Sequence, residues 1–269
     1  MKKSNSRILF VLLSMFFAAS SLFALSIPGG LIRETNLTPG AESSGKIMLV
    51  NPSDKALTIK IFKTDYLHYA DGRKIFADPG ENKFSNLEWI TFFPNQITIP
   101  AKQTGYVDYR IQVPEKSDLS GTYWSVLMIE PVPPTSPSLP ENKGKPQLGV
   151  QTIIRYALQI ITNFEKDSDK ALKFIEKQLV IKKDGKFFRI DLENTGNRLV
   201  KTSVWMEIYD SKGISLGRFT AADKRIFPAC SERFDVDLSQ LPGGDYTALL
   251  IADIGNDKVF GAKYKLKIP

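Results

Sequence analysis

The chain has 269 residues, which is long enough for two domains that each bury a core. The formal net charge of +7 comes from basic residues scattered along the sequence, without the basic patch typical of nucleic-acid-binding proteins, so we expect no nucleic-acid partner. Cys230 is the only cysteine, which excludes an intramolecular disulfide.

The first 26 residues predict a signal peptide. The first seven carry three basic side chains, Ile8–Phe17 is apolar, and Ala24-Leu25-Ser26 supplies small residues for cleavage. An uncleaved anchor is the alternative, but the apolar run is shorter than the roughly 20 residues of a membrane-spanning helix. We therefore expect an exported protein, periplasmic, secreted or in the cell envelope, with no transmembrane segment in the mature chain, residues 27–269.

The first half of the chain is a series of predicted strands. Short runs with alternating apolar residues are separated by turn residues, as is typical of β-structure. Asn51-Pro52-Ser53-Asp54 favours a tight turn, and Pro94 favours a strand that switches between sheets. The predicted strands are Leu31–Thr35, Lys46–Val50, Leu57–Lys63, Trp89–Phe93, Gln96–Ile99, Gly105–Val113 and Tyr123–Glu130.

The stretch Gln147–Phe164 differs from these strands. It follows a proline-rich segment, residues 131–146, that we expect to be an exposed loop, and it is long and apolar on both alternating faces. Ile153, Ala157 and Ile161 would also share a helical stripe, but β-branched residues dominate and no helix cap precedes the run. We expect a strand that extends beyond its own sheet and can offer one face to a partner.

The second half repeats the pattern after a boundary near Glu165–Lys170. A weak helical pattern lies at Asp167–Lys177. Short strands at regular spacing are typical of a β-sandwich, so we expect two sandwiches in series. The predicted strands here are Phe174–Lys182, Lys186–Glu193, Ser203–Asp210, Phe234–Leu238, Tyr246–Ile254 and Val259–Ile268.

No catalytic or metal-binding motif is present in the sequence. It lacks H-E-x-x-H, G-x-S-x-G, a phosphate-binding loop and the Cys/His spacing of zinc sites. His68, the only histidine, has no cysteine close in sequence, and Cys230 follows Pro228 near a turn, where a small structural residue is expected. We expect no enzymatic activity, no cofactor and no bound metal ion.

The first half resembles the amino-terminal immunoglobulin-like domain of PapD-like periplasmic pilus chaperones. The resemblance lies in the order and spacing of the turn Val50–Asp54, the proline-containing strand pair Phe92–Gln112, and Tyr123–Pro134 before a long loop. Gln151–Arg155 resembles the strand with which those chaperones complete an unfinished pilin subunit. Covering roughly residues 27–164, the resemblance implies a non-enzymatic chaperone that binds and caps subunits of a pilus- or fimbria-type structure by β-strand donation.

In that family two basic residues hold the terminal carboxylate of the subunit, and Arg33 and Arg155 resemble that pair by position. An arginine–carboxylate pair would fix the register of the partner strand. The alternative is that Arg155 pairs with an acidic neighbour and that the apolar positions are ordinary core. The candidate partner-binding residues are Arg33, Arg155, Val150, Thr152, Ile154, Tyr156 and Leu158.

The second half does not resemble the second domain of a pilus chaperone. It is similar to immunoglobulin-like or fibronectin-like modules of bacterial surface proteins, and the tandem also resembles two-domain proteins that interact with WxL surface proteins. The expected fold is all-β, with two tandem immunoglobulin-like β-sandwich domains, 27–166 and 167–269, after the signal peptide. The expected partner is an exported β-rich subunit or a surface protein. The alternative function is an envelope-associated binding or adhesion module that recognises a surface protein or peptidoglycan.

Overall fold

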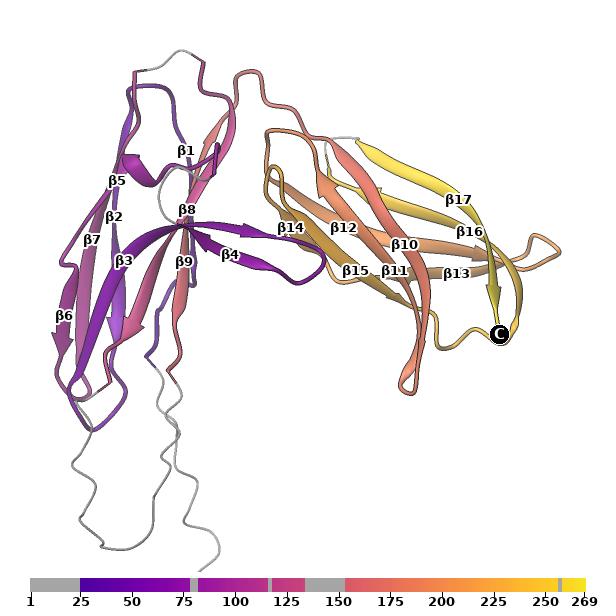
Figure 1. The fold of residues 1–269 in the computed structure, drawn as a ribbon, viewed down its shortest axis with the longest axis horizontal. Helices are drawn as coiled ribbons and strands as arrows, with labels where there is room; N and C mark the ends of the chain where they lie inside the picture. The colour runs from indigo at the N-terminus through magenta and orange to yellow at the C-terminus, as the bar shows by residue number, and fades with distance from the viewer. Residues whose placement is uncertain (1–24, 78–81, 116–117, 134–152, 256–257) are drawn as a thin grey trace, which may run out of the picture.

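The computed structural model describes residues 25–77, 82–115, 118–133, 153–255 and 258–269. Within these residues the chain is built from strands, with one short 3-10 turn, η2 (Leu87–Trp89), and forms two β-sandwiches (Figure 1). The expected fold class, two tandem immunoglobulin-like β-sandwich domains, is confirmed for this part of the chain. The strands of the first domain end with β9 (Tyr156–Phe164), and those of the second begin with β10 (Leu172–Lys182).

The first domain packs two sheets face to face. One sheet has the order β1-β9-β8-β3-β4, with β6 also paired to β3, and the other has the order β2-β7-β5. β1 runs parallel to β9, whereas the other pairs are antiparallel. The remaining strands are β1 (Ile32–Asn36), β2 (Glu42–Val50), β3 (Leu57–His68), β4 (Lys74–Ala77), β5 (Ile90–Phe93), β6 (Gln96–Ile99), β7 (Thr104–Gln112) and β8 (Gly121–Pro131).

The second domain also has two sheets, and antiparallel pairing runs throughout. One sheet has the order β10-β11-β15, and the other has the order β13-β12-β16-β17, with β14 paired to β12. The remaining strands are β11 (Gly185–Asn194), β12 (Val200–Tyr209), β13 (Ser215–Thr220), β14 (Lys224–Ile226), β15 (Ser231–Asp237), β16 (Gly244–Asp253) and β17 (Val259–Ile268).

Alternation in the sequence explains the first core. In β2, Ile47 and Leu49 are buried while Lys46 and Met48 are exposed, as expected for a strand with one face toward a core. The turn after β2 is fixed by Asn51, whose buried amide donates to three backbone carbonyls and whose Oδ1 accepts from the backbone of the turn. The tight turn expected at this point is therefore present.

The weak helical pattern at Asp167–Lys177 does not form a helix, because β10 begins at Leu172, and the strand predicted at Phe174–Lys182 is present as part of β10. β10 is an edge strand, and most of its side chains are exposed on both faces, so a strand periodicity of two is weak in its sequence. Three short strands, β4, β13 and β14, were not predicted. Each pairs with a single neighbour among the described residues and buries few side chains.

The two domains share apolar packing. Trp124 of β8 and Ile161 of β9 belong to the first domain, but their side chains pack in the core of the second. The Trp124 and Phe227 rings stack with centroids 4.6 Å apart. The hairpin of β3 and β4 extends from the first domain toward the second (Figure 1), and the backbone N–H of Ala70, in its turn, donates to Ser231 at 2.9 Å. These contacts join the two sandwiches, which are inclined to each other (Figure 1).

Candidate functional site

Strand β9 is paired along both of its edges only in its carboxyl-terminal half. β1 pairs with residues 159–163, and β8 pairs with residues 156–164 on the other side. At residues 156–158 no described strand lies on the β1 side. The polypeptide leaves this edge at Leu31, whose carbonyl accepts from the Gln159 N–H at 2.8 Å. The sheet therefore has an open edge beside Tyr156–Leu158, which we call the open β9 edge.

Backbone directions along β9 show which groups this edge presents. The N–H of Gln159 and the carbonyl of Asn163 both bond toward β1. Because the two backbone groups of one residue point to the same side and successive residues alternate, the N–H and C=O of Ala157 point to the open side. An unpaired row of this kind is a template for another strand.

The side chains of β9 serve two different cores. Leu158 and Ile160 are buried in the first domain, whereas Ile161 faces the second. Burial decreases toward the open β9 edge: Tyr156 is half-buried, and Ile154 is 50% exposed. Leu158 is fully buried in the protein's own core, so its side chain is not exposed to a partner in this structure. Of the other predicted contact residues, Val150 and Thr152 lie outside the described residues, as does most of the proline-rich loop.

Arg33 lies where the chain joins β1. Its Nη1 donates to the carbonyls of Gly29, Gly30 and Ile32 at 2.9, 3.0 and 2.9 Å. Gly29 and Gly30 both have positive φ, +83° and +72°, which glycine adopts without strain. The Arg33 side chain thus holds the turn that carries the chain away from β9.

Arg155 lies at the amino-terminal side of β9 and forms a two-pronged ion pair with Glu130 of β8, at 3.0 and 3.1 Å. Arg33 is in register with Ile160, five residues further along, which is about 16 Å of strand. Their faces differ too, because Arg33 shares the face of Ile160 and Arg155 shares that of Ile161. The structure therefore does not bring the two guanidinium groups together.

A cavity of about 740 Å³ lies between the domains beside β9. Ile32 and Gln159 line it from the first domain, and most of its cations come from the second. Several of these cations already have carboxylate partners, since Arg225 pairs with Glu34 at 2.6 Å and Lys224 with Glu232 at 3.0 Å.

Lys74 of β4 also lines this cavity. It is exposed and has no carboxylate partner in the described part of the chain. Sequence reasoning missed Lys74 because β4 itself was not predicted. No motif marks the residue, and only the hairpin that turns back along β3 brings it to the cavity.

His68, at the end of β3, is buried between the domains. Its ring stacks on Tyr66 with centroids 5.5 Å apart and meets Phe227 edge-on. Nε2 is 3.4 Å from Glu232, but burial lowers the pKa of the imidazole and outweighs the opposing effect of that carboxylate. In the described chain no three His, Cys, Asp or Glu side chains gather so that they could hold a metal ion.

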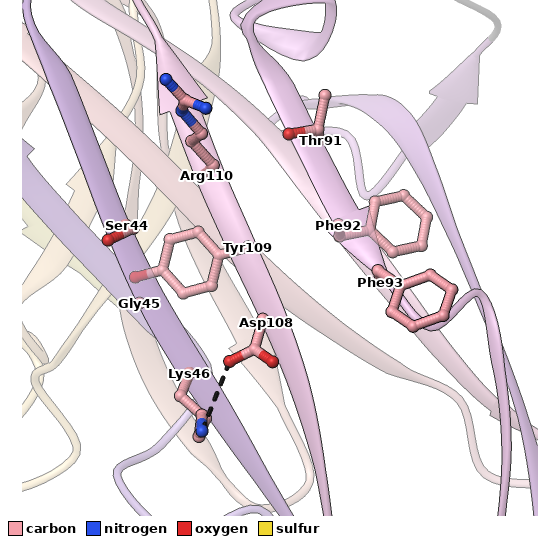
Figure 2. Close-up of a pocket in the computed structure, with 9 residues that line it drawn as sticks. All are labelled: Ser44, Gly45, Lys46, Thr91, Phe92, Phe93, Asp108, Tyr109 and Arg110. Carbon is pink, nitrogen blue, oxygen red and sulfur yellow. Dashed lines mark ion pairs between the residues drawn. The ribbon is translucent and has the colours of Figure 1, made fainter.

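A second hollow, of about 590 Å³, lies on the β2-β7-β5 sheet (Figure 2). Lys46 and Asp108 form an ion pair across it at 3.6 Å, and Phe93 at its side is 77% exposed. Its lining residues are Ser44, Gly45, Lys46, Thr91, Phe92, Phe93, Asp108, Tyr109 and Arg110. The combination of exposed aromatic and polar groups could contact a protein or glycan surface.

No helix in the described ranges has both the length and the hydrophobicity to cross a bilayer. No family model matches the sequence, and no curated protein matches it.

Solved structures do match the chain. One belongs to a chaperone–tip adhesin complex of CFA/I fimbriae biogenesis, with 16% identity over 91% of this chain and 99% of that chain, and a TM-score of 0.48. Another is the class 5 fimbriae chaperone CfaA, with 17% identity, 91% and 100% coverage, and a TM-score of 0.47. A third is the Salmonella enterica SafA pilin in complex with the SafB chaperone, with 14% identity, 92% and 99% coverage, and a TM-score of 0.45.

Proposed function

We propose that the protein is an exported, non-enzymatic chaperone that binds and caps a β-rich subunit of a pilus- or fimbria-type structure. It acts in the periplasm or cell envelope by donating a strand from the segment 147–164. The observation that carries the proposal is the open β9 edge, where the backbone groups of Ala157 face away from the sheet while Ile154 is exposed beside them.

Strand donation suits this edge physically. A subunit that lacks a strand exposes an apolar groove and an unpaired edge of its own, and an added strand supplies both hydrogen bonds and side chains. Ile154 and Tyr156 share the face that would enter the groove, and Arg155 points to the opposite face. The other half of β9 stays fixed between β1 and β8, so the donated part is held in an extended conformation before binding.

The charged residues then have separate roles. Arg33 positions the turn that leaves the edge open, through its bonds to Gly29 and Gly30. Arg155, whose guanidinium group is exposed although it pairs with Glu130, can contact the partner and help to orient it. Lys74, in the cavity between the domains, is a further cation that a carboxylate of the partner could reach without displacing another acid.

Capture from an envelope extract tests the proposal. Wild type should retain a small exported β-rich protein, and Ile154→Asp should lose it, because a charge on the donated strand would have to be buried in the groove. The matched control is Ile175→Asp on β10, a residue of similar exposure, 52% against 50%, on an edge strand of the second domain. An Arg33→Ala/Arg155→Ala double variant reports on the two arginines. Equal capture by wild type and Ile154→Asp would contradict strand donation.

Hydrogen exchange supplies a second readout on the same complex. In the unbound protein the amide of Ala157 should exchange quickly, whereas that of Ile161, which lies where β1 pairs with β9, should exchange slowly. When a partner strand pairs with the edge, protection should appear at Ala157. A partner that binds without slowing exchange at Ala157 would bind elsewhere.

The alternative function, an envelope-associated binding module, is favoured by the hollow at Phe93 (Figure 2). An exposed aromatic side chain of this kind is a typical contact residue. Under this alternative, Phe93→Ala would reduce retention of the captured protein or cell-wall material and Ile154→Asp would not. The two variants therefore separate the two functions.

A further inference from the structure

The outer face of the second domain carries a row of exposed lysines. Lys263, Lys265 and Lys267 occupy alternate positions of β17 and are all exposed, whereas Leu266 and Ile268 are buried. Because alternate residues of a strand share a face, the three lysines stand in line, with Cα atoms about 7 Å apart. No ion pair in the described ranges of the chain includes any of the three. We call them the lysine row.

A hollow of about 400 Å³ lies at one end of the lysine row. Lys265 and Lys267 line it together with the hydroxyl-bearing residues Ser211 and Thr247. Asp245 lines it as well, directly opposite Lys267 on β16, so two ammonium groups stand against one carboxylate. Ammonium and hydroxyl groups are donors to phosphate oxygens, and the excess of positive charge favours an anionic group in this hollow.

Aromatic and aliphatic side chains continue the same face across the neighbouring strands. Leu249 of β16 lies opposite Lys263, and Ile251 lies opposite Trp205 of β12; the three apolar residues are half-buried. The Arg218 guanidinium lies over the Trp205 ring, 4.3 Å from its centroid, and has a carboxylate partner on β12. The excess charge of the face therefore comes from the lysine row. Tryptophan and lysine each have an apolar body and a polar end, which suits them to the boundary between water and a bilayer.

We propose that this face docks on an anionic lipid bilayer, with the lysine row on the phosphate headgroups and one headgroup in the hollow at Lys265 and Lys267. An acidic protein strand fits less well, because lysines along an edge strand oppose the addition of another strand. The charged and aromatic residues also spread over four strands, β13, β12, β16 and β17, which suits a plane of headgroups better than one extended chain. The inference goes beyond subunit capping and rests on the proposed export alone, since the open β9 edge belongs to the first domain.

Cosedimentation of the purified, exported protein with lipid vesicles tests this docking. The protein should bind vesicles of phosphatidylcholine that contain about one-third phosphatidylglycerol, and it should not bind phosphatidylcholine alone. Lys263→Gln/Lys265→Gln/Lys267→Gln should weaken binding about 100-fold, because each lysine near an anionic surface contributes to the affinity. In wild type, raising NaCl from about 0.05 M to about 0.5 M should weaken binding by about tenfold or more, because salt screens the attraction.

The matched control is Lys173→Gln/Lys177→Gln/Lys182→Gln, which removes the same charge from three exposed lysines of β10, in the other sheet. It should bind the anionic vesicles as wild type does. Equal losses in the two triple variants would follow from net charge alone and would overturn the proposal, as would wild-type protein that leaves anionic vesicles unbound at low salt. Binding to soluble polyglutamate without binding to vesicles would assign the face to an acidic polypeptide instead. Partner capture is measured without vesicles, so this proposal and strand donation can fail separately.

Discussion

The buried residues Cys230 and His68 have the surroundings of structural residues. Cys230 is fully buried, and burial raises the pKa of its thiol to about 12, so the thiolate that a nucleophile needs is scarce near neutral pH. His68 lies close by, among Tyr66, Lys74, Lys224 and Glu232. The expectation of a structural role for Cys230 agrees with this surrounding. Neither residue offers the exposed, activated group that catalysis requires.

His68 makes the stability of the protein depend on pH. Burial lowers its pKa in the folded state below the ordinary 6.5, so the unfolded chain takes up a proton first as the pH falls. The contribution of His68 is therefore complete above pH 6.5 and is lost as the pH drops toward the lowered pKa. Urea unfolding at pH 7.5 and pH 5.5 should show a loss for wild type that is smaller for His68→Gln. Equal losses in both proteins would show that other groups dominate.

At the scale of single elements, β8 connects the domains through a glycine. Gly121, at its start, has a φ of +78°, and a Cβ there would lie 2.0 Å from the carbonyl oxygen of Asn197 in the second domain. Thr122, the next residue, donates its N–H to that same oxygen at 2.7 Å. Only a residue without a side chain allows so close an approach.

Gly121→Ala should therefore lower the free energy of unfolding by about 2–4 kcal/mol, from backbone strain and overpacking together. Gly213 is the matched control, because it has a similar φ, +81°, with nothing near its missing Cβ. Gly213→Ala should cost only the strain, about 1 kcal/mol. Denaturant titration measures both values. Similar losses for the two variants would mean that the Gly121–Asn197 contact is easily relieved.

Most strands could be predicted from the sequence, including the edge strands β10 and β17, whereas the short strands β4, β13 and β14 could not. Leu57, Ile59 and Ile61 alternate with other residues, and β3 was expected, though it runs on to His68. β10 exposes most of its side chains, so part of its sequence also has a weak helical pattern, although a strand was expected at Phe174–Lys182. In both cases the outcome follows from how much of the strand is buried, since burial is what imposes a period of two.

The candidate site was predictable only in part. Gln147–Phe164 was recognisable as unusual because it is apolar on both faces, and the reason is that Leu158 and Ile161 belong to different cores. Which half is covered depends on the pairing with β1, more than a hundred residues away in the chain. The sequence does not give this register, so it left open whether Leu158 is core and whether Arg155 pairs with an acidic neighbour, as it does with Glu130.

At the scale of the whole molecule, the shared packing joins two domains into one unit of stability. Trp124 is fully buried in the core of the second domain although β8 belongs to the first. Interfaces between domains of one chain are often polar and allow relative motion. Here a large aromatic side chain and hydrogen bonds between the domains, such as those from the Thr122 N–H to the Asn197 carbonyl and from the Ala70 N–H to Ser231, resist such motion.

Calorimetry should show one cooperative unfolding transition for the wild-type protein. Trp124→Ala should remove about 3–5 kcal/mol and separate the transition into two, because it deletes the largest side chain that the cores share. Trp205→Ala is the control, since this half-buried residue of β12 stacks under Arg218 within the second domain. Two transitions in wild type would show that the domains unfold independently.

The division of β9 between two cores also fixes its position along the sheet. A shift by one residue would turn Leu158 toward the second domain and Ile161 toward the first, so both cores would reject the shift at once. Slippage, which lets many exposed strands pair in several alignments, is thereby suppressed. A strand that pairs with the open β9 edge would therefore meet the same backbone N–H and C=O groups in one register each time.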